Sequence, residues 1–243
     1  MSQGEAHVPN DDLGWLSTTE RQRLAGMPYT KRRVEYLLGR WTAKLAVAAV
    51  EGLPTGPSAL AAIEIKPALD GAPVASLHGQ ALLRRVSLTD RAGWAVCTVS
   101  PSGLEVGCDL ELVEHRSPAF VADYFTAAEQ ALARAAPSEG DWQRLTNLIW
   151  SAKESALKVL RTGLRRDTRS VEVTLGDGVG EDWVPLTVRG AEGSTFSGWW
   201  RQYGTFILTV AAAEPVDPPV ALEEPPALAN ATPLHSWLAH PRW

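Results

Sequence analysis

The stretch "LEVGCDLEL", residues 104–112, alternates side chains with a period of two, which predicts a β-strand. One face of this strand would be apolar, and the other would carry Gly107, Asp109 and Glu111. The two carboxylates would then lie roughly 6–7 Å apart along the strand. Three interpretations are open: solvent exposure at a strand end, pairing with Arg116 or other basic residues, or binding of a hard divalent cation.

Outward from this strand, the sequence predicts helices and antiparallel strands in both directions. Upstream, "WAVCTV" (94–99) predicts the partner strand of a hairpin, turned by "PSG" (101–103). Apolar spacings of three and four predict a long helix over 31–50, ended by Gly52 and Pro54. A shorter helix is expected before it, with Thr18 or Thr19 as its N-cap.

The downstream half shows the same kinds of element. Residues 117–137 predict one or two helices, and 141–163 a long helix with Asp141 as candidate N-cap and Gly163 as its stop. Strands are then predicted at 169–176, 183–190 and 204–214. The Pro-rich composition from Glu214 onward predicts a tail or an extended wrap across the surface.

This order predicts an α+β fold of two lobes of similar build, each a small antiparallel sheet packed against a long helix. The expected boundaries are 1–103 for an N-terminal lobe, 104–213 for a C-terminal lobe and 214–243 for the tail. No internal repeat is convincing in the letters themselves.

Charge and composition narrow the class of protein. The formal net charge of the 243-residue chain is -5, yet seven basic residues face only two acidic ones between Glu20 and Lys44. Such a segment indicates a localised anion site or a solvated helix face, not general nucleic-acid affinity. Cys97 and Cys108 are interpreted as small buried apolar residues in a reducing compartment. Without a signal-like or membrane-spanning stretch, a cytoplasmic protein is expected.

A second stretch, "WSAKESALK" (150–158), lies in the predicted long helix. Trp150, Glu154 and Lys158 recur every four residues and form one stripe, with Lys153 beside it. Taken alone, the stripe is explained by core packing and a helix ion pair worth ~0.3–0.5 kcal/mol.

The two stretches together resemble the signatures of the 4'-phosphopantetheinyl transferases. That family carries a Gly-apolar-Asp-apolar-Glu strand and then an aromatic-x-x-Lys-Glu-small-x-x-Lys helix, and both patterns are complete at 107–111 and 150–158. Length and element order are similar to the surfactin-type class, which are single chains of two pseudo-symmetric lobes. The resemblance extends more loosely over about 18–212 and does not cover the tail.

The resemblance implies a site in the C-terminal lobe. Asp109, Glu111 and Glu154 would be the Mg²⁺ ligands, and Asp109, Glu154 and Lys158 the catalytic residues. Lys158, with Lys153, would steady phosphate oxygens of coenzyme A. Glu154, or a metal-bound water beside it, would take the proton of the attacking serine.

The N-terminal lobe would contact the nucleotide of coenzyme A. The sequence departs from the pattern of this family at two positions. It has Ala72 where a Lys is usual and Asp90 where a His is usual. The candidate coenzyme A ligands of this lobe are Arg23, Arg33, Arg40, Lys44, Gly71, Ala72, Pro73, Ser87 and Thr89.

The implied reaction transfers 4'-phosphopantetheine from coenzyme A to a serine of an apo acyl- or peptidyl-carrier protein domain, releasing 3',5'-ADP. Carriers of fatty-acid, polyketide or nonribosomal peptide synthesis would all fit as partners, with no nucleic acid or membrane, and a monomer is expected. The alternatives are a non-catalytic coenzyme A-binding homologue, to which Ala72 and Asp90 point, and a metal-dependent phosphohydrolase.

Overall fold

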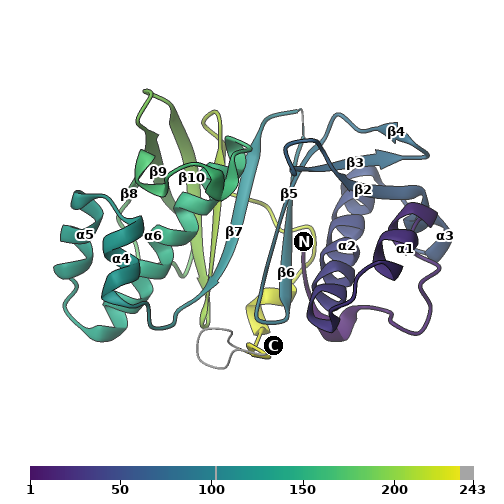
Figure 1. The fold of residues 1–243 in the computed structure, drawn as a ribbon, viewed down its shortest axis with the longest axis horizontal. Helices are drawn as coiled ribbons and strands as arrows, with labels where there is room; N and C mark the ends of the chain where they lie inside the picture. The colour runs from purple at the N-terminus through teal and green to yellow at the C-terminus, as the bar shows by residue number, and fades with distance from the viewer. Residues whose placement is uncertain (102, 236–243) are drawn as a thin grey trace. The chain divides into compact units, whose positions relative to one another are not determined.

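The computed structural model describes residues 1–101 and 103–235, and its fold is α+β with antiparallel sheets (Figure 1). The chain divides into two compact units. Unit 1 comprises Met1–Gly103 and Val220–Trp243, and unit 2 comprises Leu104–Pro219. Residues 236–243 of the predicted tail lie outside the described residues.

Unit 1 is built around the long helix α2 (Thr30–Glu51), which packs against strands of two three-stranded antiparallel sheets. The first sheet has the order β1 (Ser2–Gly4), β6 (Trp94–Ser100), β5 (Arg85–Arg91), and the second the order β2 (Ile63–Pro67), β3 (Pro73–Leu77), β4 (Gln80–Ala81). The shorter helices are α1 (Thr18–Ala25) and α3 (Pro57–Ala62).

The ends of these helices follow local chemistry. Gly52 caps α2 in the left-handed conformation, with φ of 65°, so the expected end is confirmed. The N-cap of α1 is Ser17, so the expectation of Thr18 or Thr19 is wrong. Ser17 accepts a hydrogen bond from the backbone N–H of Glu20, and the Glu20 side chain accepts one from that of Ser17. This reciprocal capping box fixes Glu20 at the first turn of α1.

The Pro-rich segment begins in unit 2, where the carbonyl oxygen of Val216 accepts from Trp199 Nε1 at 2.9 Å, and from Val220 onward it belongs to unit 1. Leu228, in the short helix η4 (Ala227–Asn230), is buried, and its backbone N–H donates to Ser2 Oγ at 3.0 Å. Glu223 Oε1 accepts from both the backbone N–H and the hydroxyl of Ser2, each at 2.7 Å. The segment therefore covers β1, which would otherwise be an open sheet edge.

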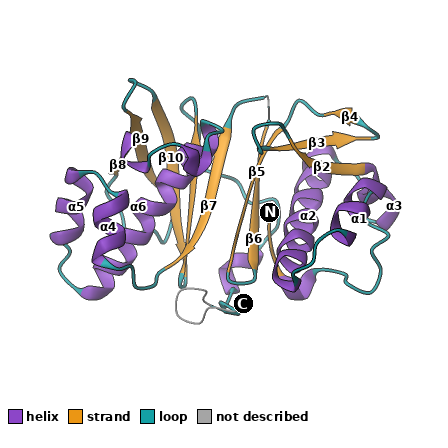
Figure 2. Ribbon diagram, in the orientation of Figure 1, coloured by secondary structure: helices purple, strands orange, loops and turns teal. Residues whose placement is uncertain are grey.

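Unit 2 is a five-stranded antiparallel sheet covered by helices (Figure 2). Its order is β7 (Val106–Leu112), β11 (Phe206–Ala212), β10 (Thr195–Tyr203), β9 (Val184–Gly190), β8 (Val171–Leu175). The long helix α6 (Glu139–Val159) packs against all five strands, and α4 (Pro118–Tyr124) and α5 (Ala127–Arg134) precede it. The N-cap of α6 is Ser138, so the expectation of Asp141 is wrong, and β10 was not predicted.

Helix α6 and strand β7 approach closely because one residue between them is glycine. A Cβ atom added to Gly107 would lie 1.9 Å from the carbonyl oxygen of Ser155 on α6. No side chain fits there without displacing helix from strand. Gly107 therefore does more than leave room beside the carboxylates, since it sets the distance between the two elements that carry them.

The two units contain a sequence repeat that the letters do not make obvious, so the expectation of no convincing repeat is wrong. The tetrapeptide Trp-Thr-Ala-Lys at 41–44 recurs as Trp-Ser-Ala-Lys at 150–153. A capping box recurs too, in α1 and in α5. Four residues of unit 1 recur 109 positions later in the chain: Ser17, Glu20, Trp41 and Lys44 as Thr126, Glu129, Trp150 and Lys153.

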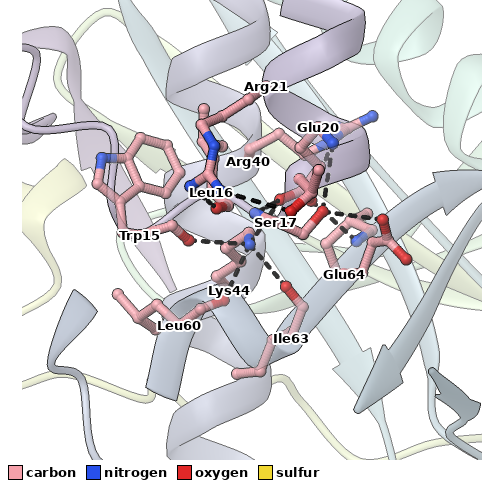
Figure 3. A network of polar contacts seen from close by, with 12 residues as sticks. Trp15, Leu16, Ser17, Glu20, Arg21, Arg40, Lys44, Leu60, Ile63 and Glu64 are labelled. Atoms are coloured by element: carbon pink, nitrogen blue, oxygen red, sulfur yellow. Dashed lines mark hydrogen bonds and ion pairs between the residues drawn. The ribbon is translucent and has the colours of Figure 1, made fainter. Parts of the chain in front are cut away.

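In unit 1 the repeat forms a buried ion pair at the centre of a polar network (Figure 3). Lys44 has no exposed surface, and its Nζ lies 2.6 Å from Glu20 Oε2. The same Nζ donates to the carbonyl oxygens of Trp15, Leu60 and Ile63, at 3.0, 2.9 and 2.6 Å. Glu20 Oε1 accepts from the backbone N–H of Ile65 at 3.1 Å, which joins α1, α2 and β2.

The corresponding pair in unit 2 makes matching contacts. Lys153 Nζ lies 2.7 Å from Glu129 Oε2 and donates to the carbonyl oxygens of Thr168 and Val171, at 2.9 and 2.5 Å. Glu129 Oε1 accepts from the backbone N–H of Val173 at 2.8 Å. Burial lowers the pKa of Lys153, as it does that of Lys44, and the partner glutamate opposes the shift in each case.

The Gly107 packing gives a direct stability test. Gly107→Ala should lower the free energy of unfolding by about 3 kcal/mol or more, because backbone atoms must move to admit the methyl group. Gly140→Ala is the matched control on α6, where the nearest atom to an added Cβ is 3.8 Å away. It should be neutral or stabilising by up to ~1 kcal/mol. Urea unfolding of both variants measures this, and equal stability of the two would contradict the packing argument.

Candidate active site

Two carboxylates of β7 are buried rather than solvated. Asp109 is 7% exposed and Glu111 9% exposed, which rules out simple solvent exposure at a strand end. In the register of the sheet, Asp109 lies opposite Thr209 of β11, and Glu111 opposite Ile207. Buried carboxylates need compensating charge or hydrogen bonds, so their neighbours decide what they can do.

Each of these carboxylates has a basic partner. Lys158 Nζ, from the last turn of α6, lies 2.8 Å from Asp109 Oδ1 and also donates to the carbonyl oxygen of Cys108 at 2.8 Å. Arg116 Nη2 lies 3.0 Å from Glu111 Oε2. The pairing with Arg116 that the sequence left open is therefore present, and it neutralises part of the charge on β7.

Arg116 is itself held from α6 and α4. Its Nε donates to Asn147 Oδ1 at 2.7 Å, and its guanidinium lies over the Phe120 ring, 4.8 Å from the centroid. Asn147 Nδ2 donates to the carbonyl oxygen of Glu114 at 2.6 Å. Sequence reasoning missed Asn147, although its position seven residues before Glu154 places both on the same helix face.

Glu154 shares the electrostatic environment of these two acids. Burial raises the pKa of Glu154 to about 7, with a further contribution from the negative charge of Asp109 and a smaller one from Glu111. Lys158 opposes the shift. For Lys158, burial is the largest single influence and would lower its pKa, but the negative charge of Asp109, the hydrogen bond to Asp109 and the smaller contributions of Cys108 and Glu154 together outweigh burial and raise it. The site therefore brings together Asp109, Glu111, Glu154 and Lys158, the four residues predicted from the two stretches.

Hydroxyl groups beneath the carboxylates join α6 to the sheet. Ser151 Oγ donates to the backbone carbonyl of Asp109 at 3.1 Å and lies 2.9 Å from Thr209 Oγ1. Ser155 Oγ lies 2.7 Å from the same hydroxyl. All three residues are fully buried. This seam holds the helix in one register against β7 and β11, and its two serines are three residues before Glu154 and one residue after it.

The donor set suits a hard cation. Three carboxylates are the oxygen ligands that Mg²⁺ prefers, and Lys158 and Arg116 leave the site with one uncompensated negative charge when all three are ionised. Among the residues that the structure describes, no three His, Cys, Asp or Glu side chains are already grouped to hold a metal ion. The chemistry of the donor set fits such an ion, which Asp109, Glu111 and Glu154 would hold.

Two lysines predicted to contact coenzyme A are instead internal. Lys44 and Lys153 have no exposed surface, and each is held by a buried glutamate and by backbone carbonyls. Neither Nζ can reach a phosphate in this conformation. Sequence alone could not tell that Lys153 is internal and Lys158 is partly exposed. The burial of each lysine depends on which face of α6 packs against α5 and β8.

The remaining candidates of unit 1 differ in accessibility. Arg23 is exposed, whereas Arg33 donates to the carbonyl oxygen of Leu24 at 2.7 Å and caps the end of α1. Arg40 stacks over the Tyr36 ring, 4.5 Å from its centroid, and lines a hollow of about 410 Å³. The other residues lining this hollow include Lys31, Arg32, Glu35, Leu88 and Asp90.

The turn and the strand predicted to meet the nucleotide are also in place. Gly71 has φ of 92°, a conformation that favours glycine, and with Ala72 it leads into Pro73, the first residue of β3. Ser87 and Thr89 lie on β5 and are 3% and 7% exposed. Their side chains therefore offer a ligand little surface.

Comparison with known families matches one segment of the chain that contains both β7 and α6. Residues 105–189 match the model of the 4'-phosphopantetheinyl transferase superfamily. The match runs from β7 to β9 and includes all three carboxylates and Lys158, so it supports a transferase of the phosphopantetheinyl type. No curated protein matches the sequence. Within the described part of the chain, no helix has the length and apolar character needed to cross a membrane.

The raised pKa of Glu154 predicts how stability depends on pH in the absence of metal. Because the folded-state pKa of about 7 lies above the ordinary value of 4.5, the folded protein retains a proton that the unfolded chain releases. This stabilisation is complete below pH 4.5 and is lost as the pH rises through about 7. Glu154→Gln, which mimics the protonated form, should remove this fall in unfolding free energy.

Denaturant unfolding between about pH 5 and about pH 8, with a chelator present, measures the effect. Glu181→Gln, which neutralises an exposed acid of the same unit, should retain the wild-type pH dependence. If Glu154→Gln follows the wild-type curve, the carboxylate is not held in the environment described.

Proposed function

We propose that the protein transfers the 4'-phosphopantetheine group of coenzyme A to a serine of an apo acyl- or peptidyl-carrier protein domain, as a single-chain enzyme of the surfactin-type class. The observation that carries the proposal is the convergence of Asp109, Glu111, Glu154 and Lys158 within the segment that matches the superfamily. A cytoplasmic monomer that acts on several carriers is the expected form.

The proposed cofactor is Mg²⁺, held by Asp109, Glu111 and Glu154. When bound, such an ion neutralises the charge of the pyrophosphate and of the departing 3',5'-ADP. Arg116 keeps the Glu111 carboxylate in place, and Lys158 keeps that of Asp109. Since 28% of its side chain is exposed, Lys158 could also pass from Asp109 to a phosphate oxygen.

The chemical step is a displacement at phosphorus. The serine oxygen of the carrier forms a bond to the β-phosphorus of coenzyme A, and the bond from that phosphorus to the oxygen of 3',5'-ADP breaks. Glu154, or a water beside it, would take the serine proton. The serine belongs to the carrier, so this chain needs no nucleophile of its own.

In unit 1, we propose Arg23 and Arg40 as the contacts for the coenzyme A phosphates, together with the backbone of the turn at Gly71, Ala72 and Pro73. Arg40 lines the hollow of about 410 Å³ described above, and Arg23 is exposed. Asp90 lies in the same hollow as Arg40, where a carboxylate would repel a phosphate. This is the observation that favours the second candidate function, a homologue that binds coenzyme A without catalysis.

The mass of an apo carrier protein, measured after incubation with coenzyme A and Mg²⁺, tests the proposal. Wild-type protein should add one phosphopantetheine group. Asp109→Asn should slow the transfer about 100-fold or more, because the amide is a poor cation ligand and leaves Lys158 without its counter-charge. Asp141→Asn, which neutralises an exposed acid at the start of α6, should transfer at the wild-type rate.

The other outcomes distinguish the alternatives. An unchanged carrier mass with retained coenzyme A binding would favour the non-catalytic homologue. Release of phosphate from a nucleotide without a carrier would favour a phosphohydrolase.

A further inference from the structure

The buried Lys153–Glu129 pair lies directly beside the proposed metal site in the sequence. Lys153 precedes Glu154 on α6, yet its side chain points away from the carboxylates, toward α5 and β8. Lys153 is 0% and Glu129 1% exposed, so neither can contact coenzyme A or a carrier protein. Any influence of this pair on the reaction must act through the residues of α6 that reach the site, among which Glu154 is the nearest in sequence.

The pair fixes the rotation of α6 about its own axis. Successive helix residues are about 100° apart, so three neighbouring anchors in different directions leave one orientation for the residue among them. Lys153 is anchored to Glu129 and to the carbonyl oxygens of Thr168 and Val171. On the sheet side, Ser151 and Ser155 are anchored through Thr209.

Glu129 is as firmly held as its partner. Its Oε2 accepts from the backbone N–H of Thr126 at 2.8 Å, as part of the capping box of α5, and its Oε1 accepts from that of Val173 on β8. The carboxylate thus ties α5 and β8 to Lys153 on α6, and Glu154 is one residue beyond that anchor.

Unit 1 supplies a natural comparison. The Lys44–Glu20 pair repeats the geometry, but Leu45 follows Lys44 where Glu154 follows Lys153, and Ala49 stands where Lys158 stands. The ion pair is therefore a device for packing the long helix in both units, and only in unit 2 does a chemically active residue depend on it.

We propose that Lys153 and Glu129 are positioning residues that orient Glu154 toward Asp109 and Glu111, and that they set the affinity of this site for Mg²⁺. This inference rests on the proposed function. It assigns Lys153 a role inside the protein rather than on the phosphates of the substrate.

The test compares matched double variants that remove both charges of a pair. Glu129→Gln/Lys153→Met alters unit 2, and Glu20→Gln/Lys44→Met makes the same change in unit 1. Glutamine retains the capping box, and removing both charges leaves no buried unpaired ion. Calorimetric titration with Mg²⁺ alone, at about pH 8 so that Glu154 is ionised, measures the metal affinity of each full-length protein.

The unit 2 variant should bind Mg²⁺ about 10- to 100-fold more weakly than the wild type, and the unit 1 variant should bind as the wild type does. Saturating Mg²⁺ should recover carrier modification by the unit 2 variant, which loss of folding would not allow. Should that double variant fail to unfold cooperatively, Glu129→Gln/Lys153→Leu, which also removes both charges and retains the capping box, replaces it.

Wild-type Mg²⁺ affinity in a folded unit 2 variant would overturn the inference while leaving the proposed function intact. Equal weakening in both double variants would also overturn it, because the effect would then be one of general stability. Failure of the wild-type protein to bind Mg²⁺ or to modify any carrier would overturn the proposed function itself.

Discussion

The structure depends on a lysine that is buried in the long helix of each unit and paired with a capping-box glutamate. Taking two charges out of water is costly, and the cost is offset only where geometry is good and the remaining hydrogen bonds are made. Both pairs meet that condition, since Lys44 and Lys153 each donate to backbone carbonyls and each glutamate accepts from a backbone N–H of a strand. An arrangement that works in only one geometry specifies the packing of helix against helix and strand.

In unit 2 the packing of α6 also positions the residues of the candidate active site. The absence of a side chain at Gly107 lets α6 lie close to β7, and the hydroxyl seam through Thr209 sets the register between them. The result places Glu154 and Lys158 near Asp109 and Glu111, in a site whose three acids outnumber its two bases. Burial, followed by the negative charges of Asp109 and Glu111, raises the pKa of Glu154 to about 7.

The sequence predicted the parts of this account that depend on short-range pattern. The alternation at 104–112 and the apolar spacings at 31–50 and 141–163 yielded β7, α2 and most of α6. Sequence-based prediction failed where the role of a residue depends on a partner that is distant in the chain. Glu129 lies 24 residues before Lys153, and nothing in the letters joins them until the capping boxes of α1 and α5 are aligned. The prediction that Lys153 and Lys44 bind phosphate is therefore wrong, because both side chains are fully buried.

The central claim is that Asp109, Glu111 and Glu154 hold one cation. Anomalous diffraction from crystals grown with coenzyme A and Mn²⁺, which replaces Mg²⁺ as a scattering probe, tests it most directly. A single strong peak in unit 2, ligated by oxygens of all three carboxylates, is expected. A peak that lacks Glu154 among its ligands, or coenzyme A bound with no peak between these residues, would contradict it.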